Sequence, residues 1–285
     1  MDFALSTYLF VNDRLNSHIL DRILAVGIRR IEIFAARHHL NYYDSNHVRD
    51  VAQWFSDHSV ALHSVHGPLF PGVEGERAGD MPISIAYLER RLRIASMDEV
   101  KRALEIAERL PFRYLVLHLG LEGEEYDLRK FDAAFTSLEH LRIFAKDRGV
   151  NVLLENIPNE LSTPERLLHF IDYTRLDLRI CFDTGHAHMT SDVSSAFATL
   201  KERIASTHVH DNTGEKDDHL MPYDGGIDWE STIREFRAVD GQFPVLFELS
   251  DHGPEKTGLA RLRKVMEKLE RIEPLSDRVI ESSGD

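Results

Sequence analysis

The sequence contains little cysteine and no long hydrophobic run, and each shortage excludes a class of protein. Its single cysteine, Cys181, excludes an internal disulfide, and the apolar run around it predicts a buried, unreactive thiol. No hydrophobic stretch approaches the roughly 18 residues that a membrane span requires. The first residues lack the basic segment and the cleavage site of an export signal. We therefore expect a cytoplasmic protein without a membrane segment.

Basic residues are too few to balance the acidic ones. The 34 Lys and Arg residues stand against 48 Asp and Glu residues, which gives a net charge of −14 at pH 7. Such a surface repels a polyanion, so nucleic acid is disfavoured as a partner. The densest basic run, residues 88–94, is typical of an exposed helix face. Histidine, in contrast, is abundant, with 16 in 285 residues, and several histidines are clustered.

Short apolar runs alternate with helical patterns along the whole chain. The runs are rich in β-branched and aromatic residues and are nearly continuous in apolarity, as strands covered on both faces require; they are residues 3–10, 29–35, 61–67, 114–120, 151–156, 179–185, 205–211 and 244–250. Apolar residues at i, i+3 and i+4 predict helices in residues 15–27, 97–110, 131–149 and 258–272, and a further helix begins at residues 162–164 with a Ser or Thr cap and a proline.

Eight strand–helix repeats predict an α/β fold, the (β/α)8 TIM barrel, as a single domain over residues 1–272. A doubly wound open sheet is the alternative. It usually has fewer strands, and no phosphate-binding G-x-G-x-x-G follows the first strand here. Residues 273–285 are polar and read as a loose C-terminal tail.

Carboxylates and imidazoles end six consecutive strands, at the barrel edge where active sites of this fold lie. They are His66, His118, Glu155, Asp183, His208 and Glu248. A single such residue is more often a hydrogen-bonded loop residue than a ligand. Glu155 and Glu248, however, follow the apolar runs "VLL" and "VLF", where an unpaired carboxylate is costly. The set therefore predicts a divalent metal ion such as Mn, Zn, Mg, Co or Fe.

Two loops add candidates with open alternatives. After the seventh strand, Asp217 and His219 belong either to a solvated acidic loop or to a loop that folds over the site and supplies further ligands. The loop of residues 36–46, "ARHHLNYYDSN", would suit a wedge into DNA or the faces and hydroxyl groups of a sugar. Glu32, at the end of the second strand, and His188 are further candidates to bind substrate hydroxyl groups, although an ordinary polar position at the surface explains both equally well, and we interpret His188 as a structural residue.

The motifs "LLEN", "CFDTGHA", "HVHDN…DDHLMPYDGGIDW" and "FELS" resemble those of the xylose-isomerase-like barrel superfamily, over nearly the whole chain. That superfamily contains sugar and sugar-phosphate isomerases and epimerases, and nucleases of the endonuclease IV type. The resemblance to ketose 3-epimerases implies one divalent metal ion held by Glu155, Asp183, His208 and Glu248. It also implies that the two glutamates are the acid/base pair and that His186 contacts the substrate. The resemblance to the nucleases implies three zinc ions, held by the same four residues together with His66, His118, His186, Asp217 and His219.

The favoured hypothesis is a metal-dependent isomerase or epimerase that moves a proton through an enediolate of a small polyhydroxy substrate. The alternatives are a phosphoesterase with two or three zinc ions and a barrel that binds a sugar without catalysis. The acidic surface, and Asp218 where the nucleases carry arginine, count against a nuclease. Xylose isomerase itself matches poorly because "ENIPNE" lacks its catalytic lysine. The sugar, its phosphorylation and the metal stay open, and a homodimer is one expected assembly because related barrels often pair.

Overall fold

The computed structural model describes residues 1–72, 81–239, 243–250 and 258–273. The predicted C-terminal tail therefore lies almost wholly outside the described residues. Eight parallel strands form one sheet, in the order β7-β6-β5-β4-β3-β2-β1-β8. They are β1 (Phe3–Ser6), β2 (Arg30–Phe34), β3 (Ala61–His66), β4 (Tyr114–His118), β5 (Asn151–Glu155), β6 (Arg179–Asp183), β7 (Ile204–His208) and β8 (Val245–Phe247).

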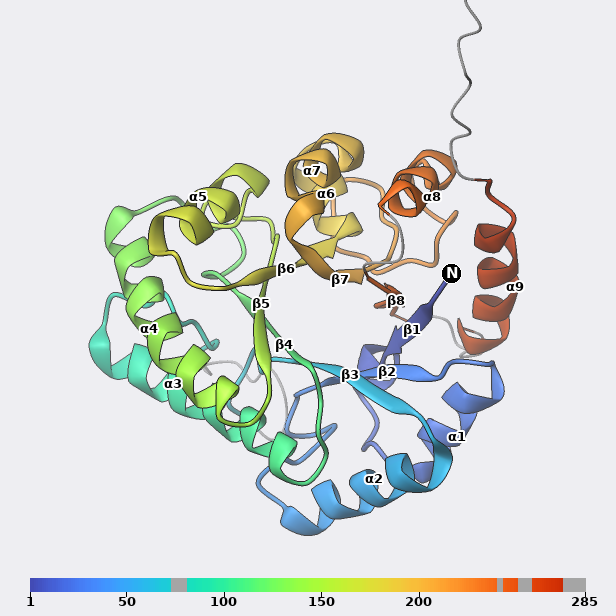
Figure 1. The fold of residues 1–285 in the computed structure, drawn as a ribbon, viewed down its shortest axis with the longest axis horizontal. Coiled ribbons are helices and arrows are strands. Elements are labelled where there is room, and N and C mark those ends of the chain that lie inside the picture. The colour runs from blue at the N-terminus through green and yellow to red at the C-terminus, as the bar shows by residue number, and fades with distance from the viewer. Residues whose placement is uncertain (73–80, 240–242, 251–257, 274–285) are drawn as a thin grey trace, which may run out of the picture.

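Helices surround the sheet on its outer side (Figure 1). The α-helices are α1 (Ser17–Ala25), α2 (Ser45–His58), α3 (Arg90–Leu104), α4 (Leu128–Lys146), α5 (Pro164–Thr174), α6 (Thr184–Thr190), α7 (Val193–Leu200), α8 (Trp229–Ala238) and α9 (Gly258–Glu270). Three 3-10 helices accompany them: η1 (Thr7–Phe10), η2 (Glu105–Glu108) and η3 (Lys201–Arg203). None of the helices in the described ranges is long and apolar enough to cross a membrane. The predicted (β/α)8 TIM barrel is confirmed.

The barrel closes between β7 and β8 through a few hydrogen bonds and not through a regular ladder of backbone hydrogen bonds. Val209 donates its N–H to the carbonyl of Leu246 at 2.8 Å and accepts from the N–H of Glu248 at 3.2 Å. The hydroxyl of Thr207 adds a bond to the carbonyl of Pro244 at 2.8 Å. These contacts fix the position of Glu248, the residue that follows β8, against the end of β7.

Two layers of apolar side chains hold the barrel together. The larger one packs the helices against the outside of the strands, and the smaller one lies apart from it and contains Tyr114, Val116, Leu153, Cys181 and Ala205. Cys181 is fully buried and unpaired, and burial raises the pKa of its thiol, as expected for an unreactive cysteine. The apolar strand runs predicted from the sequence are thus explained by burial of both strand faces.

The first strand is shorter than its apolar run. The sequence predicts a strand over residues 3–10, but β1 ends at Ser6 and the 3-10 helix η1 follows. The side chain of Ser6 caps this helix by accepting a hydrogen bond from the N–H of Tyr8 at 3.3 Å. A serine cap therefore ends the strand inside an otherwise continuous apolar segment.

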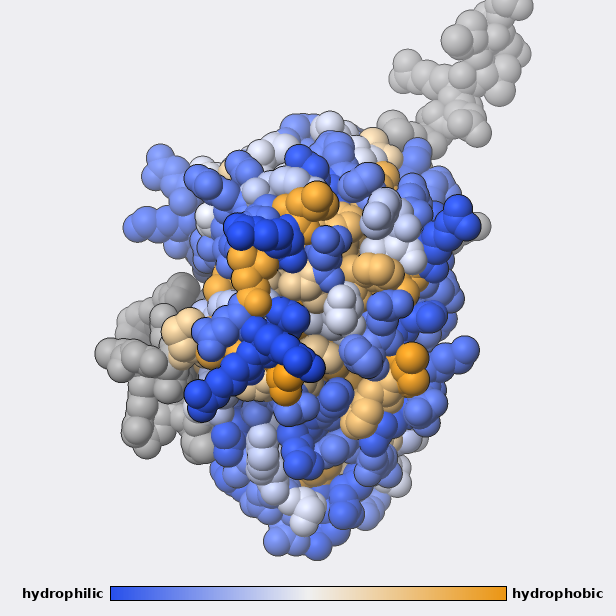
Figure 2. Space-filling model, turned by 90° about the vertical axis from the view of Figure 1, so that its left-hand side faces the viewer, coloured by the Kyte–Doolittle hydropathy of each residue, from blue (hydrophilic) through white to orange (hydrophobic). Residues whose placement is uncertain are grey.

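Figure 2 shows the side of the molecule on which α3, α4 and α5 lie in Figure 1. Hydrophilic side chains cover most of this face, and hydrophobic ones are scattered over it. Arg90 and Arg91 in α3 are exposed, which confirms the predicted exposed helix face. Single exposed apolar residues such as Leu128 and Ile143 are ordinary on a protein surface and do not by themselves indicate a partner.

Candidate metal centre

The strand registers bring the predicted residues to one level at the C-terminal end of the barrel. His118 pairs with Glu155 across β4 and β5, and Asp183 pairs with His208 across β6 and β7. His66 ends β3 in the same way, opposite Phe34 of β2. Because parallel strands end at the same edge, these side chains converge above the barrel interior.

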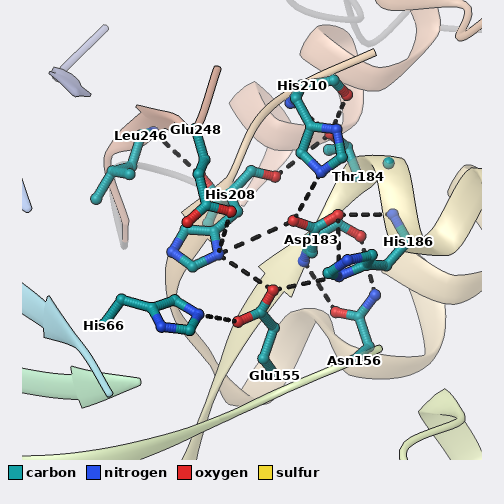
Figure 3. Close-up of polar contacts among 12 residues, drawn as sticks. His66, Glu155, Asn156, Asp183, Thr184, His186, His208, His210, Leu246 and Glu248 are labelled. Atoms are coloured by element: carbon teal, nitrogen blue, oxygen red, sulfur yellow. Dashed lines mark hydrogen bonds and ion pairs between the residues drawn. The ribbon is translucent and has the colours of Figure 1, made fainter. Parts of the chain in front are cut away.

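Four of the converging side chains form a compact group of possible ligands. One donor atom each from Glu155, Asp183, His208 and Glu248 lies within 4.8 Å of every other, and all four residues are buried. Atoms bound to one ion at about 2.0–2.4 Å lie within ~5 Å of one another, so the group has the size of a metal site. Figure 3 shows the carboxylates of Glu155 and Glu248 reaching the ring of His208 from two directions.

Imidazole rings surround the carboxylate of Glu155. One oxygen lies 3.2 Å from Nδ1 of His186 and 3.2 Å from Nδ1 of His208. The other oxygen lies 3.4 Å from Nε2 of His66 and 3.3 Å from Nε2 of His118. His66, His118 and Glu155 also form a group that could hold an ion. The centre therefore has room for more than one cation arrangement around the same carboxylate.

Several of these donor atoms are buried and make no hydrogen bond, although most lie at ion-pair distance from a neighbouring ring or carboxylate. They are both carboxylate oxygens of Glu155, Oε1 of Glu248, and Nδ1 of His186 and His208. An unpartnered polar atom in a protein interior is costly, and a buried carboxylate more so. Three carboxylates and an imidazole with no thiolate suit Mn, Zn, Mg, Co or Fe. The residues therefore fit a divalent metal ion.

The electrostatics of the centre favour positive charge at its middle. Burial alone would raise the pKa of Glu155, but the attraction of His208 and His118 holds that pKa well below its ordinary value. Burial lowers the pKa of His208, yet the surrounding carboxylates of Glu248, Glu32 and Glu155 raise it well above its ordinary value. Burial likewise lowers the pKa of His186, but the negative charge of Asp183 and the other nearby carboxylates raise it well above its ordinary value. Protons and a metal ion would thus compete for these donors.

Asp183 links the end of β6 directly to helix α6. Its carboxylate caps the helix by accepting a hydrogen bond from the N–H of His186 at 2.6 Å, which places the His186 side chain one turn into the helix and beside the centre. The side chain of Asn156 bonds both the N–H and the carbonyl of Asp183, at 2.9 Å each. The motif "CFDTGHA" is therefore a strand end and a capped helix start that hold two polar side chains in fixed positions.

The loop after β7 folds onto the centre. Oδ2 of Asp217 lies 3.3 Å from Nε2 of His186 and 3.0 Å from Nε2 of His219. Burial lowers the pKa of His219, but the hydrogen bond with Asp217 raises it to about 9. Of the two alternatives left open by the sequence, the structure favours a loop that closes over the site. Asp218, which lies between Asp217 and His219 in the sequence, has no side-chain partner among the described residues.

Two buried residues next to the centre have roles that the sequence did not reveal. Glu32 lies inside the barrel, two residues before the end of β2, and its carboxylate contacts Nε2 of His208 at 3.1 Å. His210 contacts Oδ2 of Asp183 at 3.0 Å and stacks on the ring of His219 at 4.0 Å. The spacing "H-V-H" in β7 and just beyond it was the available signal for His210, because residues i and i+2 of an extended segment face the same side.

Other candidates point elsewhere. His188 makes a hydrogen bond with the side chain of Asn212 at 2.8 Å, inside the loop after β7. The hydroxyls of Tyr42 and Tyr43 both donate to the carboxylate of Glu99 in α3, at 2.6 Å each. These tyrosines therefore clamp the loop after β2 onto α3.

Comparison with known proteins agrees with this architecture. The sequence profile of the xylose isomerase-like TIM barrel family matches residues 20–269. The chain is 28% identical over 208 residues to the uncharacterized protein y4fM of Sinorhizobium fredii, and the alignment covers 66% of each chain, slightly under two thirds.

Two solved structures share the fold at low sequence identity. A D-tagatose 3-epimerase-like protein superposes with a TM-score of 0.73 at 22% identity, over 95% of this chain and 98% of that one. The IolI protein with a bound zinc atom superposes with a TM-score of 0.72 at 19% identity, over 95% and 96%. At these identities the likeness shows the fold alone. The family profile covers most of the sequence, and the chain belongs to the xylose isomerase-like TIM barrel family.

Proposed function

We propose that this protein is a divalent-metal-dependent isomerase or epimerase of a small sugar or sugar phosphate. The observation that carries the proposal is the group Glu155, Asp183, His208 and Glu248, whose donor atoms lie within 4.8 Å of one another in a buried position. The epimerase-like protein and the zinc-containing IolI protein, which share the fold, support it.

Two glutamates in one such group suit proton transfer at a carbon next to a carbonyl. When bound, the metal ion polarises the carbonyl and makes the neighbouring C–H more acidic. One of Glu155 and Glu248 accepts that proton, and the C–H electrons enter the double bond of a planar enediolate. The other glutamate, which is protonated at the start of the step, donates its proton to the opposite face or to the neighbouring carbon. His186, 3.2 Å from Glu155, donates a hydrogen bond to the oxygen that becomes negative.

A second candidate is metal-assisted hydrolysis of a phosphoester. Two observations favour it. His66 and His118 both contact Oε2 of Glu155, and Oδ2 of Asp217 lies within 3.3 Å of the rings of both His186 and His219. Both sets could hold additional ions. This candidate predicts two or three metal ions per chain, whereas the isomerase or epimerase predicts one.

The test combines metal analysis with an exchange assay. Protein purified without chelators is analysed for metal content and incubated in D2O with a panel of ketoses and ketose phosphates. The proposal predicts about one metal ion per chain and deuterium incorporation next to the carbonyl, followed by isomer or epimer formation. Glu155→Gln and Glu248→Gln should each abolish the exchange.

A matched control separates catalysis from folding. Glu99→Gln removes a buried glutamate that accepts hydrogen bonds from Tyr42 and Tyr43, outside the barrel interior. This variant should retain metal and exchange activity. Two or three zinc ions per chain, with hydrolysis of phosphoesters and no deuterium exchange, would favour the second candidate, and wild-type protein that binds no added Mn or Zn would refute both.

A further inference from the structure

His208 is held from two sides, and the two sides differ chemically. Its Nδ1 faces Glu155, Glu248 and Asp183, at 3.2, 3.4 and 3.9 Å from their carboxylate oxygens. Its Nε2 faces away from that group, toward the two oxygens of Glu32 at 3.1 and 3.2 Å. The side chains of His208 and Glu32 are both fully buried.

Glu32 lies one layer deeper in the barrel than the proposed ligands. In the register of β2 with β3, Phe34 pairs with His66, whereas Glu32 pairs with Ser64. Two residues of a strand span about 6.6 Å, so a substrate above the centre would be separated from Glu32 by the ring of His208. In the structure the carboxylate of Glu32 contacts His208, one of the proposed ligands.

The hydrogen-bond chain Ser64–Glu32–His208 has only one consistent direction. The hydroxyl of Ser64 donates to Oε2 of Glu32 at 2.7 Å, and an ionised carboxylate is an acceptor only. Nε2 of His208 must then be the donor. An imidazole that carries its proton on Nε2, and is otherwise neutral, presents the Nδ1 lone pair to the opposite side, which is where the three carboxylates lie.

We infer that Glu32 is a positioning residue that fixes the orientation and tautomer of His208, so that Nδ1 is the nitrogen that binds the metal ion. This inference rests on the proposed metal centre and adds to it. A histidine ligand whose other N–H is bonded to a carboxylate is a stronger and better oriented base, and loss of such a partner typically weakens metal binding by about 10–100-fold. Without Glu32, the N–H at Nε2 would be buried without an acceptor, which favours other ring orientations.

Two substitutions separate the geometry from the charge. Glu32→Gln keeps an oxygen that accepts from Nε2 but removes the negative charge, so we expect roughly tenfold weaker metal binding. Glu32→Leu removes the acceptor as well, so we expect a loss of about 100-fold. Ser64→Ala leaves Glu32 in place without its second donor and should weaken binding less than either. Glu99→Gln, which alters a buried glutamate elsewhere, should bind metal like the wild type.

The measurements are Co²⁺ affinity, from competition with a chromophoric chelator, and ¹⁵N NMR of the histidine rings in Zn²⁺-loaded protein. The expected spectrum shows His208 protonated on Nε2 and bound through Nδ1. The inference is overturned if Glu32→Gln and Glu32→Leu bind Co²⁺ like the wild type, if Nε2 is the metal-bound nitrogen, or if Glu99→Gln loses as much affinity. Should Glu32→Leu fail to fold, Glu32→Gln and Ser64→Ala decide the affinity question.

Failure of this inference is distinguishable from failure of the proposed function. Neither measurement uses a substrate, so the absence of turnover on every sugar tested would leave the role of Glu32 intact. Wild-type protein that binds no Co²⁺ or Zn²⁺ would refute the metal centre itself. Wild-type protein that binds metal, beside Glu32 variants that bind it equally well, would refute the role of Glu32 alone.

Discussion

Asp211 holds the loop after β7 in place, and its hydrogen bonds allow a prediction of how much stability they contribute. Its carboxylate is fully buried and accepts four hydrogen bonds: from the N–H of Asn212 at 2.9 Å, Tyr223 at 3.0 Å and Ile227 at 3.1 Å, and from the indole of Trp229 at 2.7 Å. These donors come from the beginning and the end of the segment that carries Asp217 and His219. Asp211 is thus the common acceptor around which the loop folds.

Replacing Asp211 by alanine should destabilise the protein by about 3–6 kcal/mol. A hydrogen bond to a charged group contributes roughly 1.5–3 kcal/mol, and the indole of Trp229, which is fully buried, would lose its acceptor. The four terms do not add, because water can enter at the less buried N–H of Tyr223. Asp211→Asn should cost less than alanine, since one oxygen still accepts, but its amide would place donors against the N–H groups that Oδ2 now serves.

The assay is urea unfolding followed by far-UV circular dichroism, beside hydrogen exchange of the amides of Asn212, Tyr223 and Ile227. We expect a lower unfolding midpoint and faster exchange at these three amides. Asp218→Ala, a change in the same loop at a carboxylate with no described side-chain partner, should shift stability by less than about 0.5 kcal/mol. A loss below about 1 kcal/mol for Asp211→Ala, or equal effects of the two variants, would refute the reasoning.

Three further predictions concern packing, pH and metal. Gly185→Ala would place a Cβ where the ring of His210 lies, so it should lower the thermal midpoint and weaken metal binding, with Thr213→Ala as an exposed control. Burial lowers the pKa of His39 to about 4, against about 6.5 in the unfolded chain. The unfolded chain therefore binds the proton first, and about 3 kcal/mol of stability present above pH 6.5 is lost as the pH falls toward 4. His39→Asn should flatten this part of the urea-midpoint profile, and an unchanged slope would contradict the assignment. After metal has been removed with a chelator, added Zn²⁺ or Mn²⁺ at about 100 times its Kd should increase the free energy of unfolding by about 2.7 kcal/mol. His208→Ala should remove this effect.

The sequence predicted the barrel because strand burial leaves a strong signal. All eight apolar runs coincide with a strand, although β7 begins at Ile204, one residue before its run. The predicted helix pattern in residues 131–149 covers most of α4, which begins three residues earlier at Leu128, and the pattern in residues 258–272 contains α9. Helix α2 was not predicted, although Val48, Val51 and Phe55 have helical spacing and are buried. The short helix α6 could not be read from periodicity, since it has only seven residues and polar positions that face the site. Its start depends on capping by Asp183, which is a property of one side chain.

Side chains that face the centre from strand ends were identifiable, whereas those that support them were not. Glu155 stood out because a carboxylate after an apolar run requires a partner. His210 and Asp211 lie two and three residues beyond the end of β7. The spacing of His208 and His210 indicated that His210 faces the same side, but nothing in the sequence distinguished a buried Asp211 from a solvated one. Their roles depend on donors far along the chain, such as Trp229, and on a loop conformation in which Gly225 packs closely against Asp211.

Glu32 shows how the position of a strand boundary affects the interpretation of a residue. The sequence interpretation treated it as the end of the second strand, at the level of the substrate, because the run "RIEIF" does not mark its own last residue. The strand ends two residues later, at Phe34, which places Glu32 about 6.6 Å deeper. At that depth the carboxylate meets the far nitrogen of His208 and the hydroxyl of Ser64 instead of open space. In a barrel, alternate residues of one strand share a face but not a depth, so a carboxylate two residues before the end of β2 lies below the group of Glu155, Asp183, His208 and Glu248 and contacts it through the ring of His208.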